Sequence, residues 1–220
     1  MSKTDLSQLK LIVFDWDGTL MDSIERIVAS MQAASRDVGI DVPADDEVKE
    51  IIGLGLREAL STLFPHCEQE THTLLTERYR QHFVYESTVA TRLFEGVPEM
   101  LTRLNNSGYT LAIATGKARR GLDKVLDETN LHHFFEATRC ADETRSKPHP
   151  QMLFEIMNTT GAEAHQTLMI GDTEFDLAMA QAAGVKGLGV SYGVHSKTRL
   201  LDQGAIGCID EIREIDDWLL

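Results

Sequence analysis

The chain has few cysteines and none of the spacing that marks a disulfide-bonded or zinc-bound protein. Its three cysteines, Cys67, Cys140 and Cys208, lie far apart and form no CxxC pair. An odd number of widely spaced thiols does not fit a disulfide framework or a structural zinc site. We therefore expect three reduced and mostly buried thiols.

Long hydrophobic runs are also missing. No stretch approaches the roughly 18 apolar residues that a transmembrane helix needs. The first ten residues are polar, and the apolar run Leu11–Phe14 is too short for the core of a signal peptide. We expect a cytoplasmic protein without a membrane partner.

Positive charge is scarce. The chain has 21 Lys and Arg against 35 Asp and Glu, a formal net charge of −14. A surface of this sign repels nucleic acid and anionic membranes, so neither is an expected partner. If the substrate is an anion, its site must concentrate cationic groups locally. The content of 42% hydrophobic and 25% charged residues is that of a globular protein with a substantial core.

Short apolar runs recur along the chain and predict buried strands. They lie at Leu11–Phe14, Tyr109–Ala114, Thr167–Ile170 and Lys186–Val190, with weaker runs at 137–140 and 205–209. Helical patterns lie between most of these runs. Alternating strands and helices predict an α/β fold, with a parallel sheet covered by helices on both faces.

One connection is too long for a simple crossover. The segment between the first strand and the helix near Val97 spans about 75 residues, although one helix is enough to connect two parallel strands. It contains four amphipathic helical patterns and no convincing strand. We therefore expect an inserted helical domain.

Two aspartates follow the first strand directly, in the segment Asp15–Leu20. The two-residue period of a strand sends Asp15 and Asp17 to the same side. Neighbouring carboxylates favour a bound cation, or one proton held at a raised pKa. Such a pair suits a metal-assisted nucleophile and a general acid. By itself, however, the pattern is more typical of a polar turn at the end of a strand.

Three further loops carry polar groups that suit phosphate chemistry. Gly171–Asp176 supplies carboxylates for Mg²⁺ or for capping a helix. The segment Thr115-Gly116-Lys117 could bind an anion through a hydroxyl and backbone N–H groups, or it could be an ordinary capped turn. Lys147 is either a charge partner of a phosphate or a solvated loop lysine. The order and combination of the four loops favour the functional interpretation.

These four motifs resemble those of the haloacid dehalogenase (HAD) superfamily, and the chain is most similar to its phosphoglycolate-phosphatase-like branch. The resemblance covers nearly the whole chain. It implies a Rossmann-like catalytic core at residues 1–20 and 94–220, with an inserted all-helical cap at 21–93. It also implies a Mg²⁺-dependent phosphatase that acts on a small phosphate ester such as phosphoglycolate or a sugar phosphate.

The resemblance implies a role for each motif residue. Asp15 would attack phosphorus and form an aspartyl phosphate, and Asp17 would protonate the leaving oxygen and then activate water. Asp15, the backbone carbonyl of Asp17, and Asp172 would hold the metal, with Asp176 in or near its outer shell. Thr115, Gly116, Lys117 and Lys147 would bind the phosphoryl group, with Thr115 and Lys147 taking part in catalysis. Glycine at position 116 departs from the asparagine often found there, which puts fine substrate contacts in doubt.

The cap offers one candidate for substrate specificity. Arg57 follows a glycine-containing loop and could bind a substrate carboxylate, although it could equally be a surface arginine. The exact substrate and the choice between monomer and homodimer are left open by the sequence.

Two other functions remain open. A phosphosugar mutase of the same fold would need the same two aspartates, and only its requirement for a bisphosphate activator would separate it from a phosphatase. A non-catalytic binding protein is the second alternative, but every motif residue is present.

Overall fold

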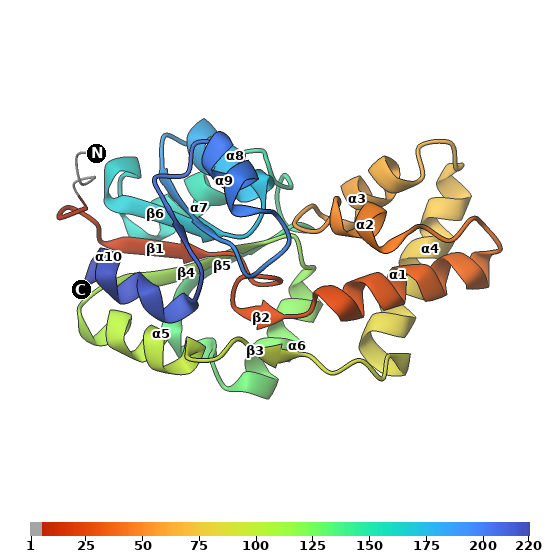
Figure 1. Ribbon diagram of the computed structural model, residues 1–220, viewed down its shortest axis with the longest axis horizontal. Helices are drawn as coiled ribbons and strands as arrows, with labels where there is room; N and C mark the ends of the chain where they lie inside the picture. Colours follow the sequence, from red (N-terminus) through yellow and green to blue (C-terminus); the bar gives the residue numbers. More distant parts are fainter. Residues whose placement is uncertain (1–5) are drawn as a thin grey trace.

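The computed structural model describes residues 6–220 and confirms the predicted α/β architecture (Figure 1). The first five residues of the predicted polar start lie outside the described part. A six-stranded parallel sheet runs through the centre in the order β5-β4-β1-β6-β7-β8. Its strands are β1 (Leu11–Phe14), β4 (Thr110–Thr115), β5 (Phe135–Cys140), β6 (Thr167–Gly171), β7 (Lys186–Val190) and β8 (Cys208–Ile209).

The central strand β1 fixes where a ligand can bind. It pairs with β4 on one side and with β6 on the other, and Leu11 lies opposite both Thr110 and Thr167. The chain first builds outward from β1 to β5, and then returns to build β6, β7 and β8 on the other side. In such open sheets the crevice for a ligand opens at the carboxyl ends of the strands where the order reverses.

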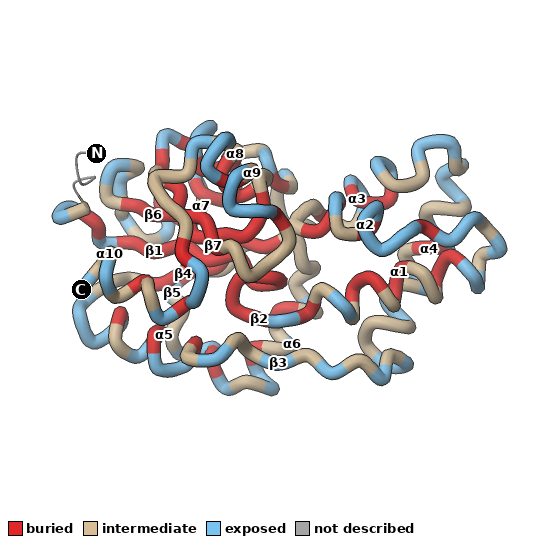
Figure 2. Tube along the Cα trace, in the orientation of Figure 1, coloured by how far each residue is buried: buried red, intermediate tan, exposed pale blue. Residues whose placement is uncertain are grey.

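Helices cover both faces of the sheet, and each face has its own buried apolar cluster (Figure 2). One cluster includes α5 (Val97–Asn106), α6 (Arg119–Thr129) and the short C-terminal α10 (Asp216–Leu219). The other includes α7 (Gln151–Thr160) and α8 (Glu174–Ala182), while α9 (Lys197–Asp202) packs beside α8 on β7. In the described part of the chain, no helix combines the length and apolarity needed to cross a membrane.

Four helices lie apart from the sheet, at one end of the molecule (Figure 1). They are α1 (Ile24–Val38), α2 (Asp45–Lys49), α3 (Leu56–Leu63) and α4 (Gln69–Gln81), and they bury a third apolar cluster of their own. A π-helical turn, His82–Glu86, continues α4. The strands β2 (Met21–Asp22) and β3 (Arg92–Leu93) pair antiparallel where this unit joins the core. The sequence pattern predicted neither the turn nor the strand pair.

Candidate active site

The carboxyl ends of three neighbouring strands bring the predicted site residues together. Asp15 comes directly after β1, Thr115 ends β4, and Asp172 comes directly after β6. The backbone N–H of Asp15 donates to the carbonyl of Ile170 at 2.9 Å, so the sheet ladder continues to the first aspartate. All three side chains are buried. This agrees with the crevice position that the strand order defines.

A fully buried lysine connects two of the carboxylates. Lys147 comes from the loop between β5 and α7, and its Nζ lies 2.8 Å from Asp15 Oδ1 and 2.6 Å from Asp176 Oδ1. Burial by itself lowers the pKa of Lys147, but the charges and hydrogen bonds of Asp15 and Asp176 outweigh it and raise that pKa above the ordinary value. The protonated form of Lys147 is therefore favoured in this site.

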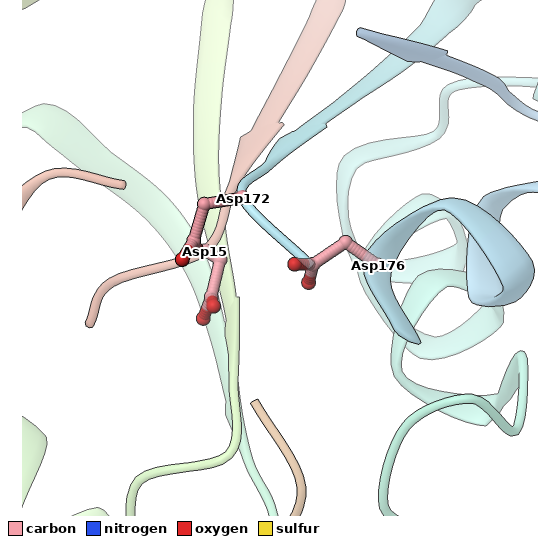
Figure 3. Close-up of side chains that lie close together, drawn as sticks. All are labelled: Asp15, Asp172 and Asp176. Carbon is pink, nitrogen blue, oxygen red and sulfur yellow. The ribbon is translucent and has the colours of Figure 1, made fainter. Parts of the chain in front are cut away.

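Asp15, Asp172 and Asp176 form an acidic cluster (Figure 3). One carboxylate oxygen from each lies within 4.8 Å of the others. Burial raises the pKa of Asp15 to about 7, with Lys147 opposing the shift and Asp176 adding to it. Burial also raises the pKa of Asp172 well above its usual range, and the charges of Asp15 and Asp176 add to this effect. The protein therefore holds Asp15 and Asp172 in surroundings that disfavour their ionised forms.

Asp172 is held in position by close backbone packing. Its Oδ1 accepts a hydrogen bond from the hydroxyl of Thr19 at 2.9 Å, and its Oδ2 accepts one from the N–H of Val194 at 2.9 Å. A Cβ atom at Gly18 would lie 2.2 Å from Asp172 Oδ2, and one at Gly193 would lie 2.3 Å from Asp172 Cβ. The glycine in the first motif therefore leaves the space that this carboxylate occupies.

The acidic cluster fits a divalent cation. In their ionised forms, the three carboxylates and the ammonium of Lys147 carry a net charge of −2, which a divalent cation would balance. Asp15 Oδ2 is buried and has no hydrogen-bond partner within the described part of the chain. Carboxylate oxygens are the preferred protein ligands of Mg²⁺, and among residues 6–220 the cluster is made of carboxylates alone.

The second aspartate of the first motif lies outside this cluster. Both oxygens of Asp17 accept hydrogen bonds from Lys117 Nζ, at 2.9 and 2.8 Å, and Oδ1 also accepts one from the Ser23 hydroxyl at 2.6 Å. The two aspartates thus have different surroundings. Asp15 belongs to the acidic cluster and is paired with Lys147, whereas Asp17 is paired with Lys117 at the end of the second motif.

The second motif makes a tight turn after β4. The backbone N–H of Lys117 donates to Thr115 Oγ1 at 3.2 Å. Gly116 lies against the loop between α2 and α3, because a Cβ atom there would be 2.6 Å from the carbonyl oxygen of Gly53 and 2.5 Å from that of Leu54. The structure thus gives a local reason for glycine at position 116.

A cavity of about 850 Å³ opens between the sheet and the four-helix unit. Asp15, Asp17, Thr115 and residues of α6 line it from the core, and residues of α1, α3, α4 and the turn at 82–86 line it from the helical unit. Arg57 is exposed on α3 and lies outside this lining. Arg26 of α1 lines the cavity instead. No sequence signal separates Arg26 from an ordinary surface arginine, because only the packing of α1 turns it inward.

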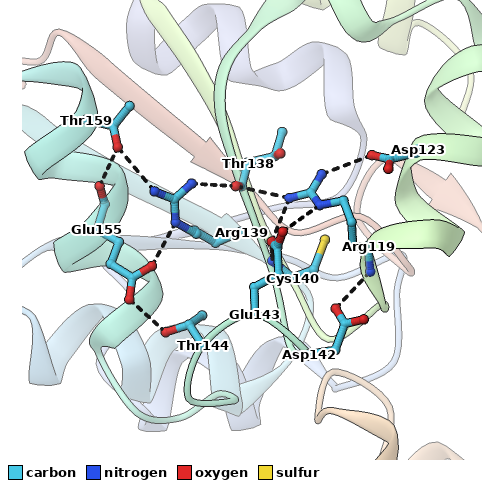
Figure 4. A network of polar contacts seen from close by, with 10 residues as sticks. All are labelled: Arg119, Asp123, Thr138, Arg139, Cys140, Asp142, Glu143, Thr144, Glu155 and Thr159. Atoms are coloured by element: carbon cyan, nitrogen blue, oxygen red, sulfur yellow. Dashed lines mark hydrogen bonds and ion pairs between the residues drawn. The ribbon is translucent and has the colours of Figure 1, made fainter.

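A polar network holds the loop that carries Lys147 (Figure 4). Glu143 accepts hydrogen bonds from Arg119 Nε at 2.9 Å and Nη2 at 2.7 Å, and from the N–H of Cys140 at 3.0 Å. The hydrogen bonds from Arg119 lower the pKa of Glu143, and Asp142 accepts from the N–H of Arg119 at 2.8 Å. The network therefore ties this loop to α6 and β5.

Comparisons with known proteins agree with this arrangement. The model of a family described as haloacid dehalogenase-like hydrolase matches residues 12–190. The chain is 35% identical over 196 residues to the "Probable phosphatase IndB" of Dickeya dadantii, a match that covers 86% of this chain and 84% of the relative. It is 31% identical over 218 residues to a phosphoglycolate phosphatase of Pseudomonas syringae pv. syringae, covering 94% and 78% of the two chains.

A solved structure shares the whole fold. The crystal structure of a predicted phosphatase from Clostridium acetobutylicum superimposes with a TM-score of 0.85 at 25% identity, and the match covers 95% of this chain and 97% of the other. The helical unit and the sheet therefore occur together in that protein too.

Proposed function

This chain belongs to the haloacid dehalogenase-like hydrolase family, and we propose that it is a Mg²⁺-dependent phosphatase that hydrolyses small phosphorylated metabolites through an aspartyl phosphate. The observation that carries the proposal is the meeting of Asp15, Lys147, Asp172 and Asp176 at the carboxyl end of β1. Bound at the acidic cluster, Mg²⁺ would neutralise charge on the nucleophile and on the phosphoryl oxygens.

Asp15 is the proposed nucleophile. One of its oxygens would form a bond to phosphorus while the bond from phosphorus to the leaving oxygen breaks. Asp15 lines the cavity, and Lys147 at 2.8 Å favours its ionised form against the effect of burial. We expect Lys147 and a bound cation together to keep this carboxylate ionised.

Asp17 is the proposed acid and base. It would give a proton to the leaving alkoxide in the first step, and accept a proton from the attacking water in the second. It lines the same cavity as Asp15, but its carboxylate is hydrogen-bonded to Lys117 and Ser23, whereas that of Asp15 is paired with Lys147. Different surroundings for two neighbouring carboxylates suit different roles.

The phosphoryl group would bind at the turn that ends β4. Thr115 and Lys117 line the cavity together with Asp15, and Lys147 Nζ lies 2.8 Å from Asp15 Oδ1. Hydroxyl, backbone N–H and ammonium groups are the usual partners of a phosphate dianion. Together with a bound divalent cation, they would supply the local positive charge that an anionic substrate requires in a protein of net charge −14.

We propose that residues 21–93 form a cap domain that closes the cavity over the substrate. The separate apolar cluster of its four helices supports this division. The cavity, about 850 Å³, leaves room for alcohols larger than glycolate, so sugar phosphates fit the proposal as well as phosphoglycolate does. We also propose a cytoplasmic enzyme, and its assembly as monomer or homodimer remains a prediction.

A panel of alkyl phosphates tests the proposal directly. We would measure phosphate release from phosphoglycolate, glycerol 3-phosphate, ribose 5-phosphate and glucose 6-phosphate, with Mg²⁺ or with EDTA. We expect Mg²⁺-dependent release from at least one, and loss of turnover in Asp15→Asn, which keeps the shape of the side chain. Full activity of that variant would exclude Asp15 as the nucleophile.

The same assay separates the two other functions. A mutase would interconvert the hexose phosphates and depend on a sugar bisphosphate, so net phosphate release without that activator speaks against it. A binding protein would release no phosphate from any compound in the presence of Mg²⁺.

A further inference from the structure

The proposed acid–base carboxylate is held by two different parts of the molecule. Ser23, which directly precedes α1, donates its hydroxyl to Asp17 Oδ1 at 2.6 Å. The N-terminus of α1 receives no side-chain cap, although serine favours that role. From the core, Lys117 Nζ reaches both oxygens of the same carboxylate, at 2.9 and 2.8 Å.

Lys117 in turn lies against an aromatic ring of the helical unit. Its Nζ is 4.7 Å from the centre of the Phe83 ring, a favourable distance for a cation–π contact. The Lys117 side chain is only 8% exposed, so water competes little with this contact. Among the described residues, Asp17 is the only hydrogen-bond acceptor of this ammonium. The ring and the carboxylate together therefore define where the ammonium lies.

Phe83 is itself fixed by its neighbours. Arg26 Nε donates to the carbonyl of Phe83 at 2.9 Å, and the Arg26 guanidinium carbon lies 5.2 Å from the ring centre. The ring also stacks on Tyr79, with centroids 5.7 Å apart and planes 25° apart.

The backbone around Phe83 is unusual. It belongs to the π-helical turn His82–Glu86, which places Phe83, Val84 and Tyr85 in the cavity wall. Turns of this kind are rare and occur often at functional sites. Arg26 lies one turn after Ser23. The chain of contacts that runs from Ser23 through Asp17, Lys117 and Phe83 to Arg26 therefore begins and ends at the start of α1.

We propose that Phe83 is a positioning residue for the reaction: its ring holds Lys117 and, through Lys117, the carboxylate of Asp17. The acid–base group is then fully in place only while the turn at 82–86 lies against the core. This inference rests on the proposed function, because it requires Asp17 to protonate the leaving oxygen.

A comparison of two leaving groups distinguishes a positioning role of Phe83 from a purely structural one. A departing alkoxide needs a proton, whereas acetate, the leaving group of acetyl phosphate, does not. Poor positioning of Asp17 must therefore slow the hydrolysis of alkyl phosphates more than the hydrolysis of acetyl phosphate. The ratio kcat/KM includes only steps up to departure of the leaving group, so hydrolysis of the aspartyl phosphate does not enter.

Three variants make the comparison. Phe83→Leu removes the ring and Phe83→Trp keeps an aromatic face, while Phe64→Leu removes a ring that packs on the same apolar cluster but outside the cavity wall. The probes are acetyl phosphate and the alkyl phosphate of the panel that is hydrolysed fastest. For Phe83→Leu we expect kcat/KM to fall at least about tenfold for the alkyl phosphate, and less than about threefold for acetyl phosphate.

The two other variants and a double-mutant cycle complete the test. Phe83→Trp should recover most of the loss, and Phe64→Leu should leave the ratio of the two probes unchanged. In a Lys117→Met background, Phe83→Leu should change kcat/KM for the alkyl phosphate no further. An equal fall for both probes, or additive effects of the two substitutions, would overturn the inference. A wild-type protein inactive on the whole panel would instead overturn the proposed function itself.

Discussion

Gly116 and Leu54 approach so closely that position 116 has no room for a side chain. A Cβ atom at 116 would lie 2.5 Å from the carbonyl oxygen of Leu54. The obstacle is backbone, which cannot move aside as a flexible side chain can. Residue 116 belongs to the core and residue 54 to the helical unit, so the contact limits how closely these two parts can meet.

We therefore expect Gly116→Asn to hold the loop at residues 53–54 away from the core. The value of kcat/KM for the best alkyl phosphate should fall about tenfold or more, a loss of roughly 1.4 kcal/mol in transition-state stabilisation. The thermal midpoint should change little. Gly161→Asn is the matched control, since nothing lies within 4 Å of a Cβ there and asparagine tolerates its positive φ. Unchanged kinetics in Gly116→Asn would show that the close approach is not needed for turnover.

Removal of the buried lysine should destabilise the fold. Lys147→Met leaves Asp15 and Asp176 without their ammonium partner, and breaking a buried pair in this way costs about 3–5 kcal/mol. Urea unfolding near neutral pH in EDTA measures the effect. Lys49→Met breaks the exposed pair with Asp46 and should cost less than about 1 kcal/mol. Similar losses in the two variants would contradict the assignment of Lys147 as the central charge.

The raised pKa of Asp15 predicts how stability changes with pH in the absence of metal. The pKa is about 7 in the folded protein against 3.8 for the unfolded chain, so the folded state binds this proton more tightly. The resulting stability is complete below pH values near 4 and is lost as the pH rises through about 7.

We expect Asp15→Asn to show a flatter pH dependence than the wild type. The difference in the free energy of unfolding between the two proteins should amount to a few kcal/mol across this range, on the order of 1.4 kcal/mol per pKa unit. Urea titrations in EDTA at several pH values provide the measurement. Parallel curves for the two proteins would show that Asp15 is ionised in both the folded and the unfolded state.

Mg²⁺ should stabilise the folded protein through the acidic cluster. A ligand present at about 100 times its dissociation constant adds roughly 2.7 kcal/mol, which raises the thermal midpoint. We expect this rise in the wild type, and its loss in Asp172→Asn. Asp123→Asn, which changes a half-exposed carboxylate on α6 outside the acidic cluster, should respond as the wild type does. If Mg²⁺ does not change the thermal midpoint of the wild type, this result would contradict the metal proposal independently of any activity assay.

The core of the fold was predictable because its signals are local. The apolar runs located the six strands of the sheet to within a few residues, and the residues after β1, β4 and β6 had to meet because parallel strands end at one edge. The pattern therefore predicts that the candidate site contains Asp15, Thr115 and Asp172.

The remaining features depend on packing between distant segments. The pairing of Asp17 with Lys117 joins residues 100 positions apart, and periodicity carries no information on such a contact. The inward turn of Arg26 and the outward position of Arg57 depend on how α1 and α3 pack. The π-helical turn at 82–86 has no compositional signal, since its residues would also continue an ordinary helix.

The paired strands β2 and β3 have a consequence for how the molecule can be altered. Met21 lies opposite Leu93, and Asp22 lies opposite Arg92, so the chain leaves the core and re-enters it at adjacent points. Everything between could in principle be exchanged for a two-residue hairpin without lengthening any connection. We expect such a shortened chain to keep its sheet while its substrate range broadens, so this pair of strands would be a suitable place to insert other helical units.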